Sequence, residues 1–267
     1  MEGTYGEHTK SEMDFVKKIL NAKLGKTHLF FVGQAGFIIK SASGQLLAID
    51  LYLSECVERI EGHIGFKRLL PQILLPQDLE FDCIVATHPH YDHFDKDAIP
   101  ELLANGRTRL YASLNCKQEM INLRANNSRA KYVKPGDVIV DGDFTLEFVT
   151  CDHGEGALDA VGVVVTVDDK KIYETGDTCL RVDRLQEYAD KGPLDVLIAP
   201  INGAYGNLNE RDCAVLSDAL KPVVTIPCHY GMFASHGGDV GVFYDIMKKE
   251  YPNNSVILMA QGEGIML

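Results

Sequence analysis

The sequence predicts a four-layer α/β sandwich, in which two β-sheets pack face to face and helices cover both outer sides. Each half of the 267-residue chain begins with several short apolar runs of strand length, and helix-like segments follow these runs in both halves. His and Asp residues stand directly after several predicted strands, where α/β proteins place their functional sites. Periodicity alone does not choose between this sandwich and other α/β layouts.

The first half contains a predicted β-meander. Its three apolar runs are separated by turns that contain Gly36 and Gly44, as expected for neighbouring antiparallel strands. A long irregular stretch follows over 51–80, with room for one helical turn. The strands expected in this half span residues 28–32, 36–40, 45–50, 82–87 and 109–113. Helices are expected over 12–22, after a cap at Asp95, and near 115–125.

In the second half the predicted strands come first and then alternate with helices. Asp168 and Asp169 stand between two apolar runs and predict a tight hairpin. The expected strands span residues 131–133, 137–140, 144–150, 160–168, 170–175, 195–200, 223–227 and 255–259. Helices are expected near 181–191, 209–220 and 239–250.

Composition and charge limit the classes of function. Hydrophobic residues make up 46% and charged residues 24%, which is typical of a globular protein. The net charge of −12 argues against binding to nucleic acid or to an anionic membrane surface, because both depend on Lys and Arg. A small anionic substrate remains compatible, since a metal ion or a few local cations can hold one.

Several features of the chain predict a single cytoplasmic domain over 1–267. The seven cysteines are widely spread without a C-x-x-C pair, which favours free thiols in a reducing compartment. The polar N-terminus does not read as a signal peptide, and no apolar run approaches the ~20 residues of a membrane span. We find no linker, repeat or low-complexity segment that would divide the chain.

The strongest chemical signal is the loop sequence THPHYDHFD at 87–95. It follows a predicted buried strand and offers His88, His90, Asp92 and His93 as donors within six positions. Three further candidates stand after other predicted strands: His153, Asp177 and His229. Imidazole and carboxylate donors without thiolate suit Zn²⁺, Mn²⁺ or Fe²⁺.

These residues form two predicted ligand sets. His88, His90 and His153 would make one site. Asp92, His93 and His229 would make the second, with Asp177 bridging two divalent ions. Three protein ligands per ion leave room for water, which is typical of a catalytic site. Asp95 is expected to cap a helix or to support a ligand, rather than to bind metal.

The order and spacing of these seven candidates resemble the metallo-β-lactamase superfamily, whose αββα sandwich agrees with the predicted layers. Within it, the chain resembles the L-ascorbate 6-phosphate lactonase (UlaG-like) family. The segments that carry this resemblance are GQAGFIIKSASGQLLAID (33–50), ATHPHYDHFD (86–95), VKPGDV (133–138), YETGDT (173–178), APINGAYG (199–206) and VVTIPCHYGMF (223–233).

The resemblance implies a binuclear hydrolase with two Zn²⁺ or Mn²⁺ ions. A metal-bridging hydroxide would attack an ester-like carbon, with a lactone of a sugar acid, such as L-ascorbate 6-phosphate, as the expected substrate. Asp92 is expected to orient or accept a proton, and His236 to contact the substrate or protonate the leaving group. The substrate-binding candidates are Tyr230, Asn202, Tyr205 and Arg68. The resemblance is also compatible with a homo-oligomer.

Other functions remain open at this point. A small-molecule or phospholipid phosphodiesterase is the main alternative, because the same two ions serve phosphoryl chemistry. A β-lactamase or thioester hydrolase, a diiron oxygen or NO reductase, and a non-catalytic metal-binding protein are less favoured. A nuclease is disfavoured by the acidic balance of the chain.

Overall fold

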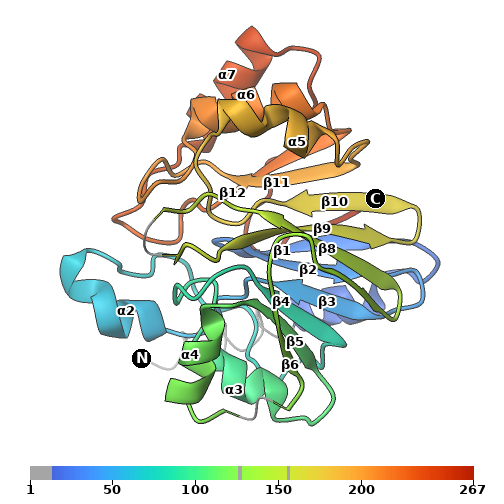
Figure 1. The fold of residues 1–267 in the computed structure, drawn as a ribbon, viewed down its shortest axis with the longest axis vertical. Helices are drawn as coiled ribbons and strands as arrows, with labels where there is room; N and C mark the ends of the chain where they lie inside the picture. Colours follow the sequence, from blue (N-terminus) through green and yellow to red (C-terminus); the bar gives the residue numbers. More distant parts are fainter. Residues whose placement is uncertain (1–13, 126–127, 155–156) are drawn as a thin grey trace.

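The computed structural model describes residues 14–125, 128–154 and 157–267, and it contains two β-sheets stacked between two layers of helices (Figure 1). The helices on the outer face of the first sheet include α3 (Ala98–Leu103), α4 (Cys116–Asn122) and a helix over 14–21, whose Phe15 and Ile19 share one core cluster with residues of β1 and β2. Three cover the second sheet: α5 (Leu185–Ala189), α6 (Glu210–Leu220) and α7 (Val240–Glu250). The four-layer prediction is therefore confirmed.

The first sheet has seven strands in the order β13-β1-β2-β3-β4-β5-β6. Its strands are β1 (His28–Gly33), β2 (Gly36–Lys40), β3 (Leu46–Ile49), β4 (Cys83–Ala86), β5 (Arg109–Ser113), β6 (Ala130–Val133) and β13 (Gly264–Met266). The first three form the expected antiparallel meander. From β3 to β6 the strands run parallel to one another.

The second sheet has six strands in the order β12-β11-β10-β9-β8-β7. Its strands are β7 (Val138–Asp141), β8 (Phe144–Thr150), β9 (Val161–Val167), β10 (Lys170–Glu174), β11 (Val196–Pro200) and β12 (Val224–Cys228). The strands β10, β11 and β12 are parallel, and the remaining pairs are antiparallel. The expected hairpin joins β9 to β10, and Asp168 adopts a φ of 52° in its turn.

Apolar side chains fill the space between the layers. The central core lies between the two sheets and includes Phe37, Phe144, Phe148 and Ile198, all fully buried. Strands such as β2 and β11 are buried at every position because helices or the other sheet cover both of their faces. The alternating exposure of β7 marks it as an edge strand with one solvated face.

Three segments outside the strands contain further helical turns. Residues 14–21 form the N-terminal helix that was expected over 12–22, and positions 12 and 13 lie outside the described residues. The irregular stretch over 51–80 contains the short helix α2 (Cys56–Glu61) and a 3₁₀ turn, η1 (Gly62–Ile64). The expected helix near 181–191 is also split, into η3 (Val182–Arg184) and α5. No helix within the described ranges is long and apolar enough to cross a membrane.

The predicted strand over 255–259 is wrong. This segment makes a single bridge, between Val256 and Thr225, and then leaves the second sheet. Ile257 and Leu258 are more than one third exposed, so the apolar run that suggested a buried strand is partly solvent-facing. The chain instead crosses to the first sheet, where β13 pairs antiparallel with β1.

Candidate metal centre

The candidate donors meet at one edge of the sandwich because their strands point the same way. The loop with His88 and His93 follows β4, and Asp177 and His229 follow β10 and β12, which are parallel. His153 follows β8, which is antiparallel to β9 and so runs in the same direction as β10. The carboxyl ends of these strands therefore open on a common site.

Three histidines form the first donor group. The Nε2 atom of His88 lies 3.0 Å from Nδ1 of His90, and Nε2 of His153 lies 3.0 Å from the same Nδ1 atom. His88 and His153 are buried, while His90 lies on the open side of the group. The structure thus brings together the three residues of the first predicted ligand set.

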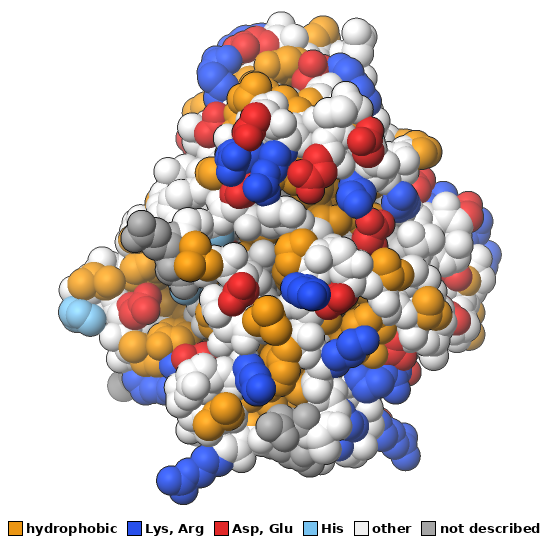
Figure 2. Space-filling view, in the orientation of Figure 1, with side chains coloured by type: hydrophobic (Ala, Val, Ile, Leu, Met, Phe, Trp, Pro, Cys, Tyr) orange, Lys and Arg blue, Asp and Glu red, His pale blue; other side chains and the backbone are white. Residues whose placement is uncertain are grey.

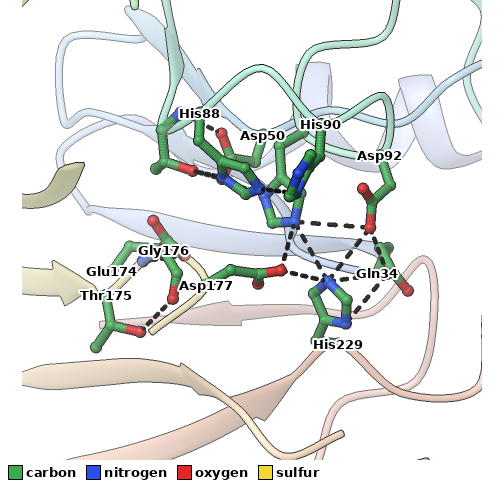
Figure 3. Close-up of polar contacts among 12 residues, drawn as sticks. Gln34, Asp50, His88, His90, Asp92, Glu174, Thr175, Gly176, Asp177 and His229 are labelled. Atoms are coloured by element: carbon green, nitrogen blue, oxygen red, sulfur yellow. Dashed lines mark hydrogen bonds and ion pairs between the residues drawn. The ribbon is translucent and has the colours of Figure 1, made fainter. Parts of the chain in front are cut away.

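Four side chains form the second donor group: Asp92, His93, Asp177 and His229. Figure 3 shows Asp92, Asp177 and His229 directed toward one another. Nε2 of His229 lies 3.2 Å from Nε2 of His93 and 3.2 Å from one carboxylate oxygen of each aspartate. Nε2 of His93 lies 3.6 Å from Asp92 and 3.4 Å from Asp177. A tetrahedral ion with bonds of about 2.0–2.1 Å would separate its ligands by about 3.3–3.4 Å, so the spacing fits a metal.

The chemistry of both groups also fits a cation. Imidazole lone pairs and carboxylate oxygens converge at these distances, and like partial charges repel one another unless a proton or a metal ion lies between them. Burial lowers the pKa of His88 well below its usual range, which leaves it a neutral donor. Burial lowers the pKa of His153 to about 4, although the negative charge of Asp177 raises it in part.

Asp177 connects the two groups. Its Oδ2 atom lies within 3.2 Å of His229 in the second group and 3.8 Å from Nε2 of His153 in the first. Burial works against a charged carboxylate here, but His229 and His93 lower the pKa of Asp177 well below its usual range. Burial lowers the pKa of His229, but the carboxylates of Asp177 and Asp92 outweigh it and raise the pKa to about 9. One oxygen therefore stands where a bridging ligand would be needed.

Asp50 is a supporting residue that the sequence analysis missed. It follows β3, is fully buried, and accepts a 2.7 Å hydrogen bond from Nδ1 of His93. The Thr87 hydroxyl donates to Asp50 and therefore accepts from Nδ1 of His88. Both histidines are thereby held with Nε2 toward the donor groups. An available signal was its position at the end of the apolar run QLLAID.

Gln34 is a second supporting residue without a role in the sequence analysis. Its side-chain amide donates to Asp92 at 2.8 Å, and its backbone carbonyl oxygen accepts from the backbone N–H of His229 at 2.7 Å. Both Gln34 and His229 have a positive φ, at 56° and 63°. Such backbone conformations are costly for residues other than glycine and cluster at functional sites.

Five of the seven donors, all except the buried His88 and His93, line a cavity of about 620 Å³. Two of the expected substrate-contacting residues also line it. His236 packs its ring against Phe66, Tyr205 and the ligand candidate His229. Burial and then the charge of His229 lower the pKa of His236 to about 4, so its imidazole is neutral at pH 7. Tyr205 is 58% exposed at the rim.

Three other expected substrate contacts have different partners in the structure. The Arg68 guanidinium donates to the carbonyl oxygens of Ser54 and Leu70 and lies 4.6 Å from the ring centre of Tyr52. The hydroxyl of Tyr230 donates to the carbonyl oxygen of Met259. Asn202 is buried and accepts from Asn207. None of the three is among the described residues that line the cavity.

Asp95 supports the local backbone, as expected for a residue that is not a ligand. One of its oxygens accepts from the backbone N–H groups of Asp97 and Ala98 at the start of α3. The other accepts from the N–H groups of Leu53 and Ser54. Asp95 thus ties the segment before α2 to the metal-facing loop.

Comparison with known proteins identifies the family. A family model described as the beta-lactamase superfamily domain matches residues 28–229, so the chain belongs to this superfamily. A metal-dependent hydrolase of Anaeromyxobacter dehalogenans is 27% identical over 231 residues, or 81% of this chain and 79% of that protein. A metal-dependent hydrolase of Thermococcus kodakarensis is 25% identical over 241 residues, or 89% and 98%. The solved structure of Igni18, a metallo hydrolase from Ignicoccus hospitalis, matches with a TM-score of 0.70 at 20% identity over 91% of this chain and 98% of its own.

These findings confirm the metallo-β-lactamase fold and the hydrolase class. The chain is a metal-dependent hydrolase whose His and Asp clusters could bind metal. The names of these relatives do not specify a lactonase, so the narrower resemblance stays a prediction.

Proposed function

We propose that the protein is a two-metal hydrolase of carboxylic esters, with a lactone as the preferred substrate. The observation that carries this proposal is the position of Asp177 Oδ2 between the two donor groups, 3.2 Å from His229 and 3.8 Å from His153. Asp177 would thus be a ligand common to both ions of a two-metal centre. The proposed ligands are His88, His90 and His153 for one ion, Asp92, His93 and His229 for the other, and Asp177 for both.

Divalent ions bound there would make water nucleophilic at neutral pH and polarise the scissile carbonyl, with Zn²⁺ and Mn²⁺ as the proposed metals. The residues of the chain do the positioning. Asp50 and Thr87 keep the Nε2 atoms of His93 and His88 directed at the site. The side-chain amide of Gln34 donates to Oδ2 of Asp92 and does not occupy Oδ1. We propose that this oxygen orients or accepts the proton of the attacking water.

His236 and Tyr205 are proposed to contact the substrate. Both line the cavity, and their rings lie 5.4 Å apart on the side of His229. The neutral His236 ring can offer an N–H to the oxygen of the leaving group. Arg68, Tyr230 and Asn202 are not included in this proposal, because their polar atoms serve other partners.

A combined metal analysis and hydrolysis panel tests the proposal. The purified protein is loaded with Zn²⁺ or Mn²⁺ and assayed with lactones, p-nitrophenyl phosphodiesters and thioesters. We expect about two ions per chain and turnover of lactones. Turnover of phosphodiesters alone would show that the phosphodiesterase alternative is correct.

Two variants connect any activity to the proposed centre. Asp177→Asn and His93→Ala should lose nearly all turnover and part of the bound metal, while circular dichroism shows the fold retained. Asp137→Asn is a suitable control, because this carboxylate accepts from the backbone N–H of Lys134 at a distant turn. Unchanged rates in the first two variants would contradict the mechanism.

A further inference from the structure

One wall of the cavity is apolar, and the proposed hydrolysis does not account for it. The segment formed by α2, η1 and the residue after Gly65 contributes Val57, Ile60, Ile64 and Phe66 to the cavity lining. Figure 2 shows hydrophobic side chains gathered over this protruding segment, at the left of the view. The donor side chains His90, His153 and Asp177 line the same cavity, so the apolar wall faces the candidate metal centre.

The exposure of this wall is unusual for its residue types. Ile60 and Ile64 are 39% and 61% exposed, although both are large aliphatic side chains. Single exposed apolar residues are common on protein surfaces. These two share one concave site with the buried Val57 and Phe66, and an apolar surface of this shape is typical of small-molecule binding.

The charges around the cavity disfavour an anionic group next to this wall. The described residues of the lining include Glu61 and Glu119 but neither Lys nor Arg. The nearby Lys96 forms an ion pair with Glu119 at 2.8 Å and lies over the ring of Tyr91. Arg68 is bound to backbone carbonyls. His63 of η1 also lines the cavity, so a phosphate placed against the wall would face an imidazole but no Lys or Arg among the described residues.

We propose that the wall of Val57, Ile60, Ile64 and Phe66 is a subsite for an uncharged hydrocarbon part of the substrate. This inference rests on the proposed ester hydrolysis at the neighbouring centre. It also changes the expected substrate: the group bound beside the reacting ester is an alkyl or aryl group instead of a phosphorylated sugar. The substrate itself would then be uncharged, and negative charge would develop only at the reacting carbonyl, where bound metal ions would balance it. The cavity of about 620 Å³ is large enough for a ligand of this kind.

Binding of straight-chain alkanoates tests the subsite without requiring turnover. Butanoate, hexanoate and octanoate are titrated calorimetrically into the metal-loaded protein. Burying each added methylene should tighten binding by about three- to fourfold. A dissociation constant that is independent of chain length would overturn the proposal.

A matched pair of variants assigns the effect to the wall. Ile64→Ser replaces a cavity-lining side chain, and Val242→Ser replaces a side chain of similar exposure, 48%, on α7 outside the lining. Ile64→Ser should weaken octanoate binding by about fivefold while it changes butanoate binding little. Val242→Ser should leave both unchanged. Equal effects of the two variants would contradict the assignment.

Hydrolysis then separates this inference from the proposed function. A lactone with an alkyl substituent is compared with the same lactone carrying a phosphate, and we expect kcat/KM to favour the alkyl compound by at least about tenfold. Preference for the phosphorylated lactone would refute the subsite but support lactone hydrolysis. Chain-length-dependent alkanoate binding without hydrolysis of any lactone or ester would support the subsite and refute the proposed function.

Discussion

The buried carboxylate of Asp50 forms a third possible metal-binding group with His88 and His93, but its hydrogen bonds favour a supporting role. Its oxygens receive hydrogen bonds from His93 and from both the backbone N–H and the hydroxyl of Thr87. Together with the bond between Thr87 and His88, these contacts fix the orientation of two imidazoles. Asp50 therefore acts as a positioning residue for both donor groups.

Replacing Asp50 by Asn should weaken metal binding by about 10–100-fold with little change in the fold. The amide keeps the size of the carboxylate but has one accepting oxygen, so it cannot accept from the Thr87 backbone N–H on one side and from His93 and the Thr87 hydroxyl on the other. Metal affinity is measured by competition with a chromogenic chelator. Asp82→Asn is the control, because Asp82 also accepts a backbone N–H but precedes β4 and so lies at its other end. Equal affinities in the two variants would show that Asp50 does not position the ligands.

At the scale of elements, the position of the loop that carries His236 depends on two glycines that pack closely against the ends of neighbouring strands. A Cβ atom at Gly237 would lie 2.6 Å from the carbonyl oxygen of Asn202, which follows β11. The next residue, Gly238, has a φ of 92°, and a Cβ atom there would lie 3.4 Å from the Cα of Asn202 and 3.4 Å from the carbonyl oxygen of His229. The loop can therefore approach the strand ends only without side chains, and this approach brings His236 to the cavity.

Gly237→Ala should destabilise the protein by about 1–3 kcal/mol, because the loop or β11 must move to relieve the contact. Urea unfolding measures the loss, and metal content should stay unchanged, since no proposed ligand lies in the loop. Gly62→Ala serves as the control: its backbone is helical, and the new Cβ would meet only the Glu58 side chain at 3.4 Å. Destabilisation of both variants to the same degree would argue against the packing explanation.

The short elements α2 and η1 show what the sequence could predict at this scale. The interruptions by Gly62, Gly65 and Pro71 correctly predicted an irregular stretch with little helix. They did not reveal that this stretch forms a cavity wall. That depends on packing of Phe66 against Phe233 and Tyr205, residues more than 130 positions away in the chain.

At the scale of the whole molecule, the donor residues connect the two sheets. The loop after β4 belongs to the first sheet, whereas His153, Asp177 and His229 follow strands of the second. An ion held by residues from both sheets binds the folded state and not the unfolded chain. Metal binding should therefore stabilise the whole sandwich.

Removal of metal with a chelator should lower the melting temperature by roughly 10 °C. Binding at a thousandfold excess over Kd contributes about 4 kcal/mol, and each kcal/mol shifts the melting temperature of a chain this size by about 2–4 °C. Differential scanning calorimetry measures the shift, and added Zn²⁺ or Mn²⁺ should reverse it. Asp177→Asn should show a much smaller response to the chelator. A chelator shift as large in this variant as in the original chain would place the stabilising metal elsewhere.

The sequence by itself determined the layers of the fold and the candidate donors. Strand-length apolar runs predicted nearly all strands, and the donors could be recognised because His and Asp stand at short spacing directly after them. The expectations of one domain, a cytoplasmic location, a small anionic substrate without nucleic acid or membrane, and a homo-oligomer depend on composition or resemblance, and they stay predictions.

Only the tertiary structure decided how these residues are used. Arg68 was expected to contact the substrate, but its guanidinium donates to the carbonyl oxygens of Leu70, two residues on, and of Ser54. The segment over 255–259 read as a strand, but its place beside β12 allows one bridge before the chain crosses to β1. Asp50 and Gln34 read as parts of a strand and a turn, yet they hold the donors in position. For Asp50, Gln34 and the 255–259 segment the deciding contact joins residues more than 30 positions apart, and local patterns carry no information about such pairs.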